Sequence, residues 1–390
     1  MKVSLSWLKE YIRVDMEPAD IASELTMAGL EVEAMEDRFA RLDNGVVVGR
    51  VKNVEPHPNA DKLTCCTVNT GSREARVICG APNVREGLTV ACALPGAVLP
   101  GDFEIKSSKI RGEKSEGMLC SGNELKLNTD TGGIMELEEG LVPGTPLARA
   151  LGLSDYVFEI DLTPNRPDCL SMLGVAREVG AFLNPPESAS YPDYELYREK
   201  TGDFSISRHT DIAIEDPDLC PRYAAGLLMD VKVEPSPSWL KERLESVGLT
   251  PVNNIVDVTN YVMLETGQPL HAFDFDLLAQ HRIVVRRLGQ KEEFTTLDGK
   301  THNLDPETLM ICDGEKPVAI AGVMGGGNSE ISDNTSRVLL ESACFNPVSI
   351  RKTAKKTGIA TDASHRFERG VDPDGTVNAL KRALYLLTEV

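Results

Sequence analysis

Long apolar runs are missing from this sequence of 390 residues. No stretch approaches the roughly 18 consecutive apolar residues that a membrane-spanning helix needs. The first residues, MKVSLSWLKEYIRVD, are amphipathic and partly acidic, unlike a signal or transit peptide. We therefore expect a cytoplasmic protein that has no membrane partner.

Cysteine pairs of the CxxC type are also missing. The nine cysteines are odd in number and scattered along the chain, which favours reduced and mostly buried thiols. His57 with Cys65, Cys66 and Cys79 has the right residue types for a metal site, but the spacing fits no common zinc pattern. We expect no metal site in this chain.

Positive charge is scarce. There are 41 Lys and Arg residues against 60 Asp and Glu, and the net charge of −19 argues against a protein that grips polyphosphate over its whole surface. Two local basic stretches remain, IKSSKIRGEK at 105–114 and RKTAKKTG at 351–358. Taken singly, each stretch is most simply a solvated face.

The length is sufficient for two or three domains. From about 45 to 140 the sequence consists of short β segments separated by turn clusters: GVVVGRV, KLTCCTV, EARVICG, LTVACAL and GIMELEE. This spacing is typical of a small barrel or sandwich. The mixture of proline, charge and small residues at 184–203 indicates a linker, and the patterns after about 205 indicate an α+β domain with antiparallel pairing.

Helix start and stop signals are clear in several places. Asp168 and Ser236 are candidate caps for the helices expected in CLSMLGVAREVGAFL and PSPSWLKERLESVG. In FNPVSIRKTAKKTG, Asn346 is the expected cap, Pro347 takes the first turn and Gly358 ends the helix. Asp-Gly turns in TTLDGKTH and MICDGEKPVAIAG predict two hairpins.

Catalytic signatures are few. The glycine-rich segment AGVMGGGN at 321–328 lacks the GK[ST] of a phosphate-binding loop, so we interpret it as a tight backbone approach. There is no GxSxG and no HExxH. The candidate functional side chains are polar groups expected in loops, together with a carboxylate in RVLLESACF: Asn260, His271, Thr361, His365 and Glu341.

Glu341 is unusual because RVLLESACF predicts a buried strand. An unpaired carboxylate inside such a strand costs several kcal/mol. Either the strand alternation turns Glu341 to solvent, or the carboxylate has a function.

Several motifs, in this order, resemble the editing region of the beta subunit of bacterial phenylalanyl-tRNA synthetases: NIVDVTNYVMLETGQPLHAFD, AIAGVMGG, LLESACFNP and TDASHRFERGVDP. SWLKEYI with TMAGLEVE, and IDLTPNRPDCLSMLGVAREV, are similar to the N-terminal domain of the same subunit. HPNADKL, GAPNV and SEGMLCS resemble its OB-fold tRNA-binding domain, which also occurs in other tRNA-associated proteins. Together these matches cover nearly the whole chain.

The resemblance implies an α+β multidomain fold. An OB-fold β-barrel at 40–151 would be inserted in a small α/β N-terminal domain formed by 1–39 with 152–190. A linker at 191–205 and a mixed α+β editing domain at 206–390 would follow. The natural subunit would continue past residue 390, since the last residues follow a helical pattern with no stop signal.

The function implied by the resemblance is the hydrolysis of mischarged tyrosyl-tRNA(Phe). A site shaped for phenylalanine rejects an added hydroxyl only about a hundredfold, whereas a second site that hydrogen-bonds the hydroxyl discriminates by roughly 10⁴. Glu341 would receive the tyrosine hydroxyl. The rest of the tyrosyl pocket would be lined by Pro269, Gly325, Gly326, Thr361 and Ala363.

The catalytic group implied by the resemblance consists of His271, Asn260 and Thr259, which would orient the terminal adenosine and the attacking water. A histidine near its ordinary pKa can act as a general base, but positioning alone supplies much of an ester hydrolysis rate. We favour positioning for His271.

The partners implied are tRNA(Phe) and the catalytic alpha subunit in an (αβ)₂ tetramer. ATP and Mg²⁺ would serve phenylalanine–tRNA ligation in the full complex and need no site here, because this chain has neither a HIGH-type signature nor a class II ATP-site pattern. The alternative interpretation is a non-catalytic RNA-binding or structural module that supports the catalytic alpha subunit.

Overall fold

A computed structural model describes residues 1–127, 131–194 and 205–390. Most of the linker predicted at 191–205 lies outside the described residues. None of the described helices is long and apolar enough to cross a bilayer.

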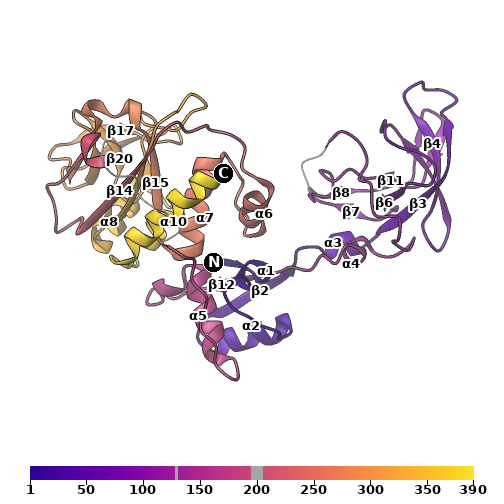
Figure 1. Ribbon diagram of the computed structural model, residues 1–390, viewed down its shortest axis with the longest axis horizontal. Helices are drawn as coiled ribbons and strands as arrows, with labels where there is room; N and C mark the ends of the chain where they lie inside the picture. Colours follow the sequence, from indigo (N-terminus) through magenta and orange to yellow (C-terminus); the bar gives the residue numbers. More distant parts are fainter. Residues whose placement is uncertain (128–130, 195–204) are drawn as a thin grey trace. The chain divides into compact units, whose positions relative to one another are not determined.

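The chain divides into two compact units (Figure 1). One unit is Glu36–Val157, and the other joins Met1–Met35 to Phe158–Val390. The β-rich unit is thus inserted in the other unit in sequence. The finer division of the larger unit into an N-terminal domain and a domain from 206 stays a prediction.

The smaller unit is built on a curled antiparallel sheet with strand order β11-β6-β3-β4-β5. Its strands are β3 (Val46–Pro56), β4 (Thr64–Asn69), β5 (Glu74–Cys79), β6 (Thr89–Ala93) and β11 (Met118–Leu119). The two ends of the sheet approach each other, because the Glu116 N–H donates to the Arg76 carbonyl at 2.7 Å and the Ile78 N–H donates to Ser115 Oγ at 3.1 Å. The sheet is therefore nearly closed.

Smaller elements complete this unit: α3 (Ala40–Asp43), β7 (Val98–Leu99), β8 (Phe103–Glu104), β9 (Ser108–Ile110), β10 (Glu113–Ser115) and α4 (Leu147–Ala150). The strand predicted in GIMELEE is wrong. That segment forms one isolated bridge, between Glu136 and Val90, because its neighbouring N–H groups donate to two different segments, Met135 to Cys120 and Leu137 to Thr89.

The larger unit begins with a three-stranded sheet of order β1-β12-β2. Its elements and the nearby helices are β1 (Lys2–Ser4), α1 (Leu5–Leu8), α2 (Pro18–Met27), β2 (Glu31–Asp37), β12 (Tyr156–Asp161) and α5 (Met172–Phe182). The cap predicted for α5 is wrong: Ser171 accepts from the Gly174 N–H at 3.0 Å, while the Asp168 carboxylate accepts from the Arg166 guanidinium.

Two further sheets follow in the larger unit. A five-stranded sheet contains β13 (Asp211–Ile214), β16 (Arg282–Arg287), β19 (Leu309–Cys312), β20 (Pro317–Ile320) and β21 (Met324–Gly325), in that order. A three-stranded sheet has the order β14 (Arg222–Leu228), β22 (Val338–Cys344) and β15 (Leu270–Asp274). The predicted hairpins are confirmed as β17 (Glu292–Thr295) with β18 (Thr301–Leu304), and as β19 with β20.

Pairing within these sheets is antiparallel, as predicted, except between β13 and β16, which are parallel. The main hydrophobic core includes side chains from both sheets, among them Phe273, Leu339, Ile311 and Val318.

Helices cover the other face of the three-stranded sheet. They are α7 (Asn254–Thr266) and α10 (Gly375–Glu389), which pack against each other (Figure 1). Gly226 of β14 lies against Leu384 of α10, and Ser342 Oγ of β22 donates to the Thr376 carbonyl at 2.8 Å. These contacts fix which face of the sheet α10 covers.

The remaining helices are α6 (Ser238–Ser246), α8 (Pro347–Thr357) and α9 (Asp362–Phe367). The signals predicted for α8 are confirmed, since Asn346 caps it and Gly358 ends it with φ of 70°. The cap predicted for α6 is wrong. Pro237 precedes the helix without a side-chain bond, and Ser236 Oγ donates instead to the buried Asp257 carboxylate.

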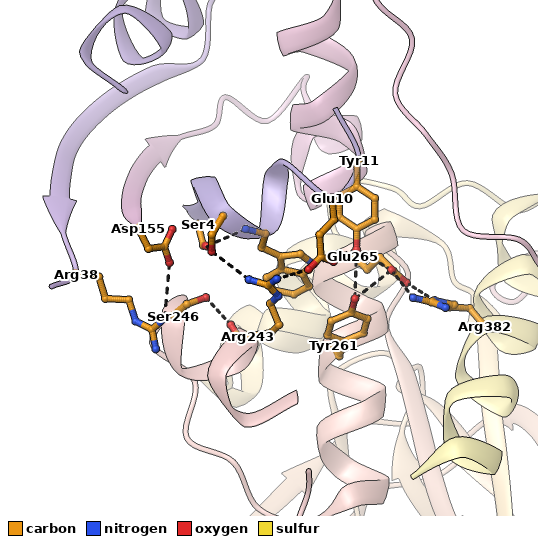
Figure 2. Close-up of polar contacts among 12 residues, drawn as sticks. Ser4, Glu10, Tyr11, Arg38, Asp155, Arg243, Ser246, Tyr261, Glu265 and Arg382 are labelled. Carbon is orange, nitrogen blue, oxygen red and sulfur yellow. Dashed lines mark hydrogen bonds and ion pairs between the residues drawn. The ribbon is translucent and has the colours of Figure 1, made fainter. Parts of the chain in front are cut away.

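A buried polar network ties the start of the chain to α7 and α10 (Figure 2). The Glu265 carboxylate accepts from the Tyr11 hydroxyl at 2.7 Å and from two nitrogens of Arg382 at 2.9 and 3.0 Å. Trp7 donates to the Tyr11 hydroxyl and stacks on Tyr261 with ring centroids 4.9 Å apart. This network explains why the first residues belong to the same compact unit as α7 and α10.

Candidate functional site

Glu341 lies in the middle of β22 and is only 6% exposed. It is paired with His271 of β15 on one side and with Ala225 of β14 on the other. Paired residues of neighbouring strands point to the same face of a sheet, and successive residues alternate. Ser342 faces α10, so Glu341 and His271 face the hydrophobic core on the opposite side. The solvent-facing alternative for Glu341 is wrong.

The Glu341 carboxylate has one hydrogen-bond partner in the described part of the chain. The Tyr223 hydroxyl donates to Oε2 at 2.7 Å. Burial raises the pKa of Glu341 to about 7, and the bond from Tyr223 partly offsets this shift. A carboxylate has about four lone-pair sites, so Glu341 retains unused capacity to accept a hydroxyl donor.

His271 is the second residue of β15. The sequence pattern had predicted a loop at this position. The prediction was wrong because Leu270–Asp274 pairs along its length with β22. Burial lowers the pKa of the imidazole to about 4, so His271 is neutral near pH 7. Its ring meets the Phe273 ring edge-on at 4.5 Å between centroids.

The glycine-rich segment passes directly over this imidazole. A Cβ placed on Gly325 would lie 2.5 Å from His271 Cε1 and 2.8 Å from Nε2. A Cβ on Gly326 would meet the Phe294 ring at 2.6 Å and the Val318 carbonyl oxygen at 2.7 Å. The predicted tight backbone approach is confirmed, and only glycine fits at either position.

The start of α9 is held beside the same segment. Thr361 is the cap of α9 and not a loop residue, and its Oγ1 donates to the Val323 carbonyl at 2.9 Å. Ala363 packs against the core that contains Phe273 and Leu339. His365 lies within α9, also not in a loop, and its Nδ1 is bonded to Arg369 at 2.9 Å.

Thr259 and Asn260 are not brought into this group by any contact among the described residues. Both lie in α7, so the loop expected for Asn260 is wrong, and α7 packs beside α10 on the opposite face of the sheet. Thr259 Oγ1 donates to the Val256 carbonyl of its own helix at 2.7 Å. Pro269 directly precedes β15.

Two residues with clear roles were missed by the sequence predictions. Tyr223 supplies the donor that a buried Glu341 requires, and Gln268 Nε2 donates to the Pro269 carbonyl at 3.0 Å and to the Ala343 carbonyl at 2.8 Å. The cost of burying Glu341 signals that some donor must exist. Nothing in the sequence identifies Tyr223, which is 118 positions away.

The structure also bears on metal binding. Asp168, Cys169 and Glu178 have potential ligand atoms within 4.8 Å of one another, but the Arg166 guanidinium already forms ion pairs with both carboxylates. Both nitrogens of His57 are engaged, Nε2 with the Ile110 carbonyl and Nδ1 with the Asn59 N–H. All nine cysteines are free and buried.

The geometry therefore joins a buried carboxylate with unused acceptor capacity, a neutral imidazole and a glycine segment on one face of a sheet.

Comparison with known families assigns two regions of the chain. Residues 46–146 match the family described as "Putative tRNA binding domain", and residues 219–390 match the "B3/4 domain" family. These matches define a multidomain α+β chain that joins a tRNA-binding type of domain to a B3/4 domain.

Curated relatives match the chain over its whole length. The phenylalanine–tRNA ligase beta subunits of Desulfotalea psychrophila, Syntrophus aciditrophicus and Geobacter metallireducens are 51%, 52% and 52% identical to it over 100% of the chain. The chain belongs to the phenylalanine–tRNA ligase beta subunit family. It spans about half the length of these relatives, 47%, 48% and 48% respectively.

Among solved structures, an N-terminal fragment of the phenylalanyl-tRNA synthetase beta subunit from Pyrococcus horikoshii is 16% identical, with a TM-score of 0.29. This similarity covers 53% of the chain and 62% of that fragment.

Proposed function

We propose that this chain is the part of a phenylalanine–tRNA ligase beta subunit that hydrolyses mischarged tyrosyl-tRNA(Phe). The observation that carries the proposal is Glu341, a buried carboxylate that faces the inside of the domain and holds one phenolic hydroxyl already. The Tyr223 hydroxyl at 2.7 Å is a chemical precedent, within the protein, for the bond that a tyrosyl substrate would make.

The choice between tyrosyl and phenylalanyl esters would follow from the hydrogen bonding of the Glu341 carboxylate in each complex. A tyrosyl group would donate its hydroxyl to the unused lone pairs of the carboxylate, with a charge-assisted bond when Glu341 is ionised. A phenylalanyl group offers no donor and would leave the carboxylate desolvated. This difference supports discrimination of roughly 10⁴ in favour of hydrolysing the tyrosyl ester.

His271 would position the ester and the attacking water. Because burial lowers its pKa to about 4, the neutral imidazole can accept a hydrogen bond from water at physiological pH but is a weak base. Gly325 would leave room beside the ring, and Thr361, Ala363, Gly326 and Pro269 would shape the remaining wall. Thr259 and Asn260 would contribute through the terminal adenosine, from α7.

The smaller unit would bind tRNA as an OB-fold barrel. Its curled five-stranded sheet is consistent with that fold, and the β9–β10 hairpin exposes Lys109 and Arg111. In the larger unit, the basic residues of α8 lie on its solvent-facing side: Arg351, Lys352, Lys355 and Lys356. Local positive surfaces of this kind can contact phosphates although the net charge is −19.

The assembly we propose is a cytoplasmic (αβ)₂ complex with the catalytic alpha subunit. ATP and Mg²⁺ would serve amino acid activation in that complex. Editing is ester hydrolysis by water and requires neither of them at the Glu341 site.

The test is the rate of deacylation of tyrosyl-tRNA(Phe) by this chain, alone and with the alpha subunit and the full-length beta subunit. We expect hydrolysis that falls at least tenfold in His271→Ala, about the loss expected when a positioning contact is removed. No hydrolysis in the complete complex would favour the alternative, a non-catalytic RNA-binding or structural module that supports the alpha subunit.

A further inference from the structure

A cavity of about 680 Å³ in the larger unit is lined by residues of α8 and α9, of β1 and α7, and of the segment after α6. The volume is within the range of small-molecule sites, about 300–1,000 Å³. Thr361 is part of the lining, and its Oγ1 donates to the Val323 carbonyl at 2.9 Å, two residues before Gly325. The cavity therefore adjoins the wall of the proposed hydrolytic site.

The same cavity connects that wall to α7. Leu264 of α7 lines it, and Asn260, which is half-buried, lies one turn earlier on the same face of the helix. No direct contact among the described residues brings Asn260 to His271. A ligand that fills this cavity contacts both α7 and the start of α9.

One face of α8 lines the cavity. Its lining residues follow the three- and four-residue spacing of a helix face: Arg351, Ala354, Lys355 and Gly358. Lys352 and Lys356, each one position further along, are not part of the lining, and Lys356 forms an ion pair with Asp305. The spacing therefore directs the exposed Arg351 and Lys355 side chains toward the cavity.

A third exposed cation comes from β1. Lys2 lines the cavity, and its Nζ lies 3.8 Å from the place of a Cβ on Gly248. Gly248 stands between two lining residues, Val247 and Leu249. The Lys2 ammonium group is therefore at the edge of the cavity that the segment after α6 forms.

The carboxylates of the lining do not balance these cations. Asp362 is paired with Arg366 at 3.0 Å, and Glu368 is paired with Arg369 at 2.9 Å. The side chains of the three exposed cations form no hydrogen bond or ion pair within the described part of the chain. The C-terminal ends of α6 and α8 each contribute only about half a negative charge. An excess of positive charge remains, which favours an anionic ligand.

His365 adds a flat surface to the lining. Its imidazole is exposed, and the bond between Nδ1 and Arg369 at 2.9 Å holds the ring. Unstacked bases pack on aromatic side chains, histidine included. Aliphatic side chains complete the wall: Leu170, Val247, Leu249, Leu264 and Ile359. The cavity thus offers cations for a phosphate and a surface for a base.

We propose that this cavity binds a nucleotide. The three exposed cations bind its phosphate, and its base stacks on His365 beside the aliphatic wall. The inference rests on the proposed function for one source of the nucleotide, the single-stranded 3′ end of tRNA(Phe), which that function brings to Thr361 and Asn260. A free nucleotide presents the same phosphate and base, and the experiment separates the two sources.

The experiment is calorimetric titration of the whole chain with the trinucleotide CpCpA and with AMP, at several salt concentrations. We expect CpCpA to bind at least tenfold more tightly, because its two phosphates engage cations on both sides of the cavity. Equal affinities would assign the cavity to free nucleotides.

Variants locate the bound probe. Lys355→Ala should weaken CpCpA binding and lower the slope of log affinity against log salt by about 0.7, the value for one phosphate contact on a single strand. His365→Ala should weaken binding about tenfold, and His365→Phe should restore it because the stacking surface returns. Lys291→Ala, at an exposed position outside the lining, should change neither the affinity nor the slope.

Neither probe carries an aminoacyl ester, so the titration does not depend on hydrolysis. An absence of deacylation while CpCpA still binds here would contradict the proposed function alone. Three results would overturn the nucleotide site: no binding of either probe, equal effects of Lys355→Ala and Lys291→Ala, or binding by His365→Phe that is no tighter than binding by His365→Ala.

Discussion

Glu265 and Glu341 are two buried carboxylates of the same compact unit, and their surroundings are opposite in kind. Glu265 is 0% exposed and is paired with the Arg382 guanidinium and with the Tyr11 hydroxyl. Glu341 is 6% exposed, and its one hydrogen-bond partner among the described residues is the neutral Tyr223.

The difference shows how a buried charge is assigned to structure or to function. A carboxylate with a cation and a full set of donors holds parts of the chain together, here Tyr11 after α1, α7 and α10 (Figure 2). A carboxylate with no cation and unused lone pairs has a raised pKa, as Glu341 has, and is available to a ligand. The sequence alone gives no such distinction between the two.

The largest expected effect is on the structural member of this pair. Glu265→Ala leaves the Arg382 guanidinium buried without its partner, and we expect a loss of about 3–5 kcal/mol in the free energy of unfolding. Urea denaturation measures this change in the free energy of unfolding. Glu245→Ala, at an exposed position of α6, is the matched control and should change stability by less than about 0.5 kcal/mol. If Glu265→Ala and Glu245→Ala lowered the free energy of unfolding equally, Glu265 would not have the structural role that distinguishes it from Glu341.

The next effect is the pH dependence of stability that the raised pKa of Glu341 produces. Its folded pKa of about 7 lies above the ordinary 4.5, so the folded state binds the proton more tightly than the unfolded state does. The corresponding stability is present below about pH 4.5 and is lost as the pH rises to about 7, up to about 3 kcal/mol in all. Glu341→Gln should therefore gain stability relative to wild type across this window.

The measurement is urea denaturation of both proteins at several pH values. His271 contributes with the opposite sign, because its lowered pKa makes the folded state less stable as the pH falls from 6.5 toward about 4. Taking the difference between wild type and Glu341→Gln removes that contribution. A difference that does not vary between pH 4.5 and 8 would falsify the raised pKa.

A smaller effect should follow from Gly325→Ala. The added methyl group would overlap the His271 ring, and relieving this overlap costs about 1–3 kcal/mol. Because the ring must move, deacylation of tyrosyl-tRNA should fall as well. Gly327→Ala is a suitable control, since a Cβ there would have its nearest neighbour at 3.8 Å. Similar behaviour of the two variants would contradict the close approach of the glycine segment.

An effect of similar size is expected from Tyr223→Phe. Removing the hydroxyl takes away the bond that favours ionised Glu341, so the pKa of Glu341 should rise further, and stability above pH 7 should fall by about 1–3 kcal/mol. Carbon NMR of the glutamate carboxyl groups follows the titration directly. An unchanged or lowered midpoint would show that Tyr223 is not the partner.

Local signals in the sequence predicted much of the fold. The α8 boundaries, the two Asp-Gly hairpins and most strands of the smaller unit depend on short-range rules of capping, turn geometry and alternation. The predictions failed where a contact between residues far apart in the sequence determines the local structure. Ser236 bonds Asp257 instead of capping α6, and GIMELEE is divided between two partners instead of extending a sheet.

The candidate site could be predicted only in part for the same reason. The strand pattern identifies Glu341 as a carboxylate whose burial would be costly, but it leaves open whether the side chain faces solvent. His271 was placed in a loop because a proline two residues earlier weakens a strand pattern, and only the pairing with β22 shows otherwise. Tyr223 and Gln268 were missed because their partners are set by tertiary structure.

The most direct test of the central claim is the ratio of deacylation rates for tyrosyl-tRNA(Phe) and phenylalanyl-tRNA(Phe), measured for wild type and Glu341→Ala in the complex with the alpha subunit. We expect the wild type to favour the tyrosyl ester strongly and the variant to lose about a hundredfold or more of this preference. An unchanged ratio in Glu341→Ala would contradict the claim that the unused acceptor of this buried carboxylate selects the substrate.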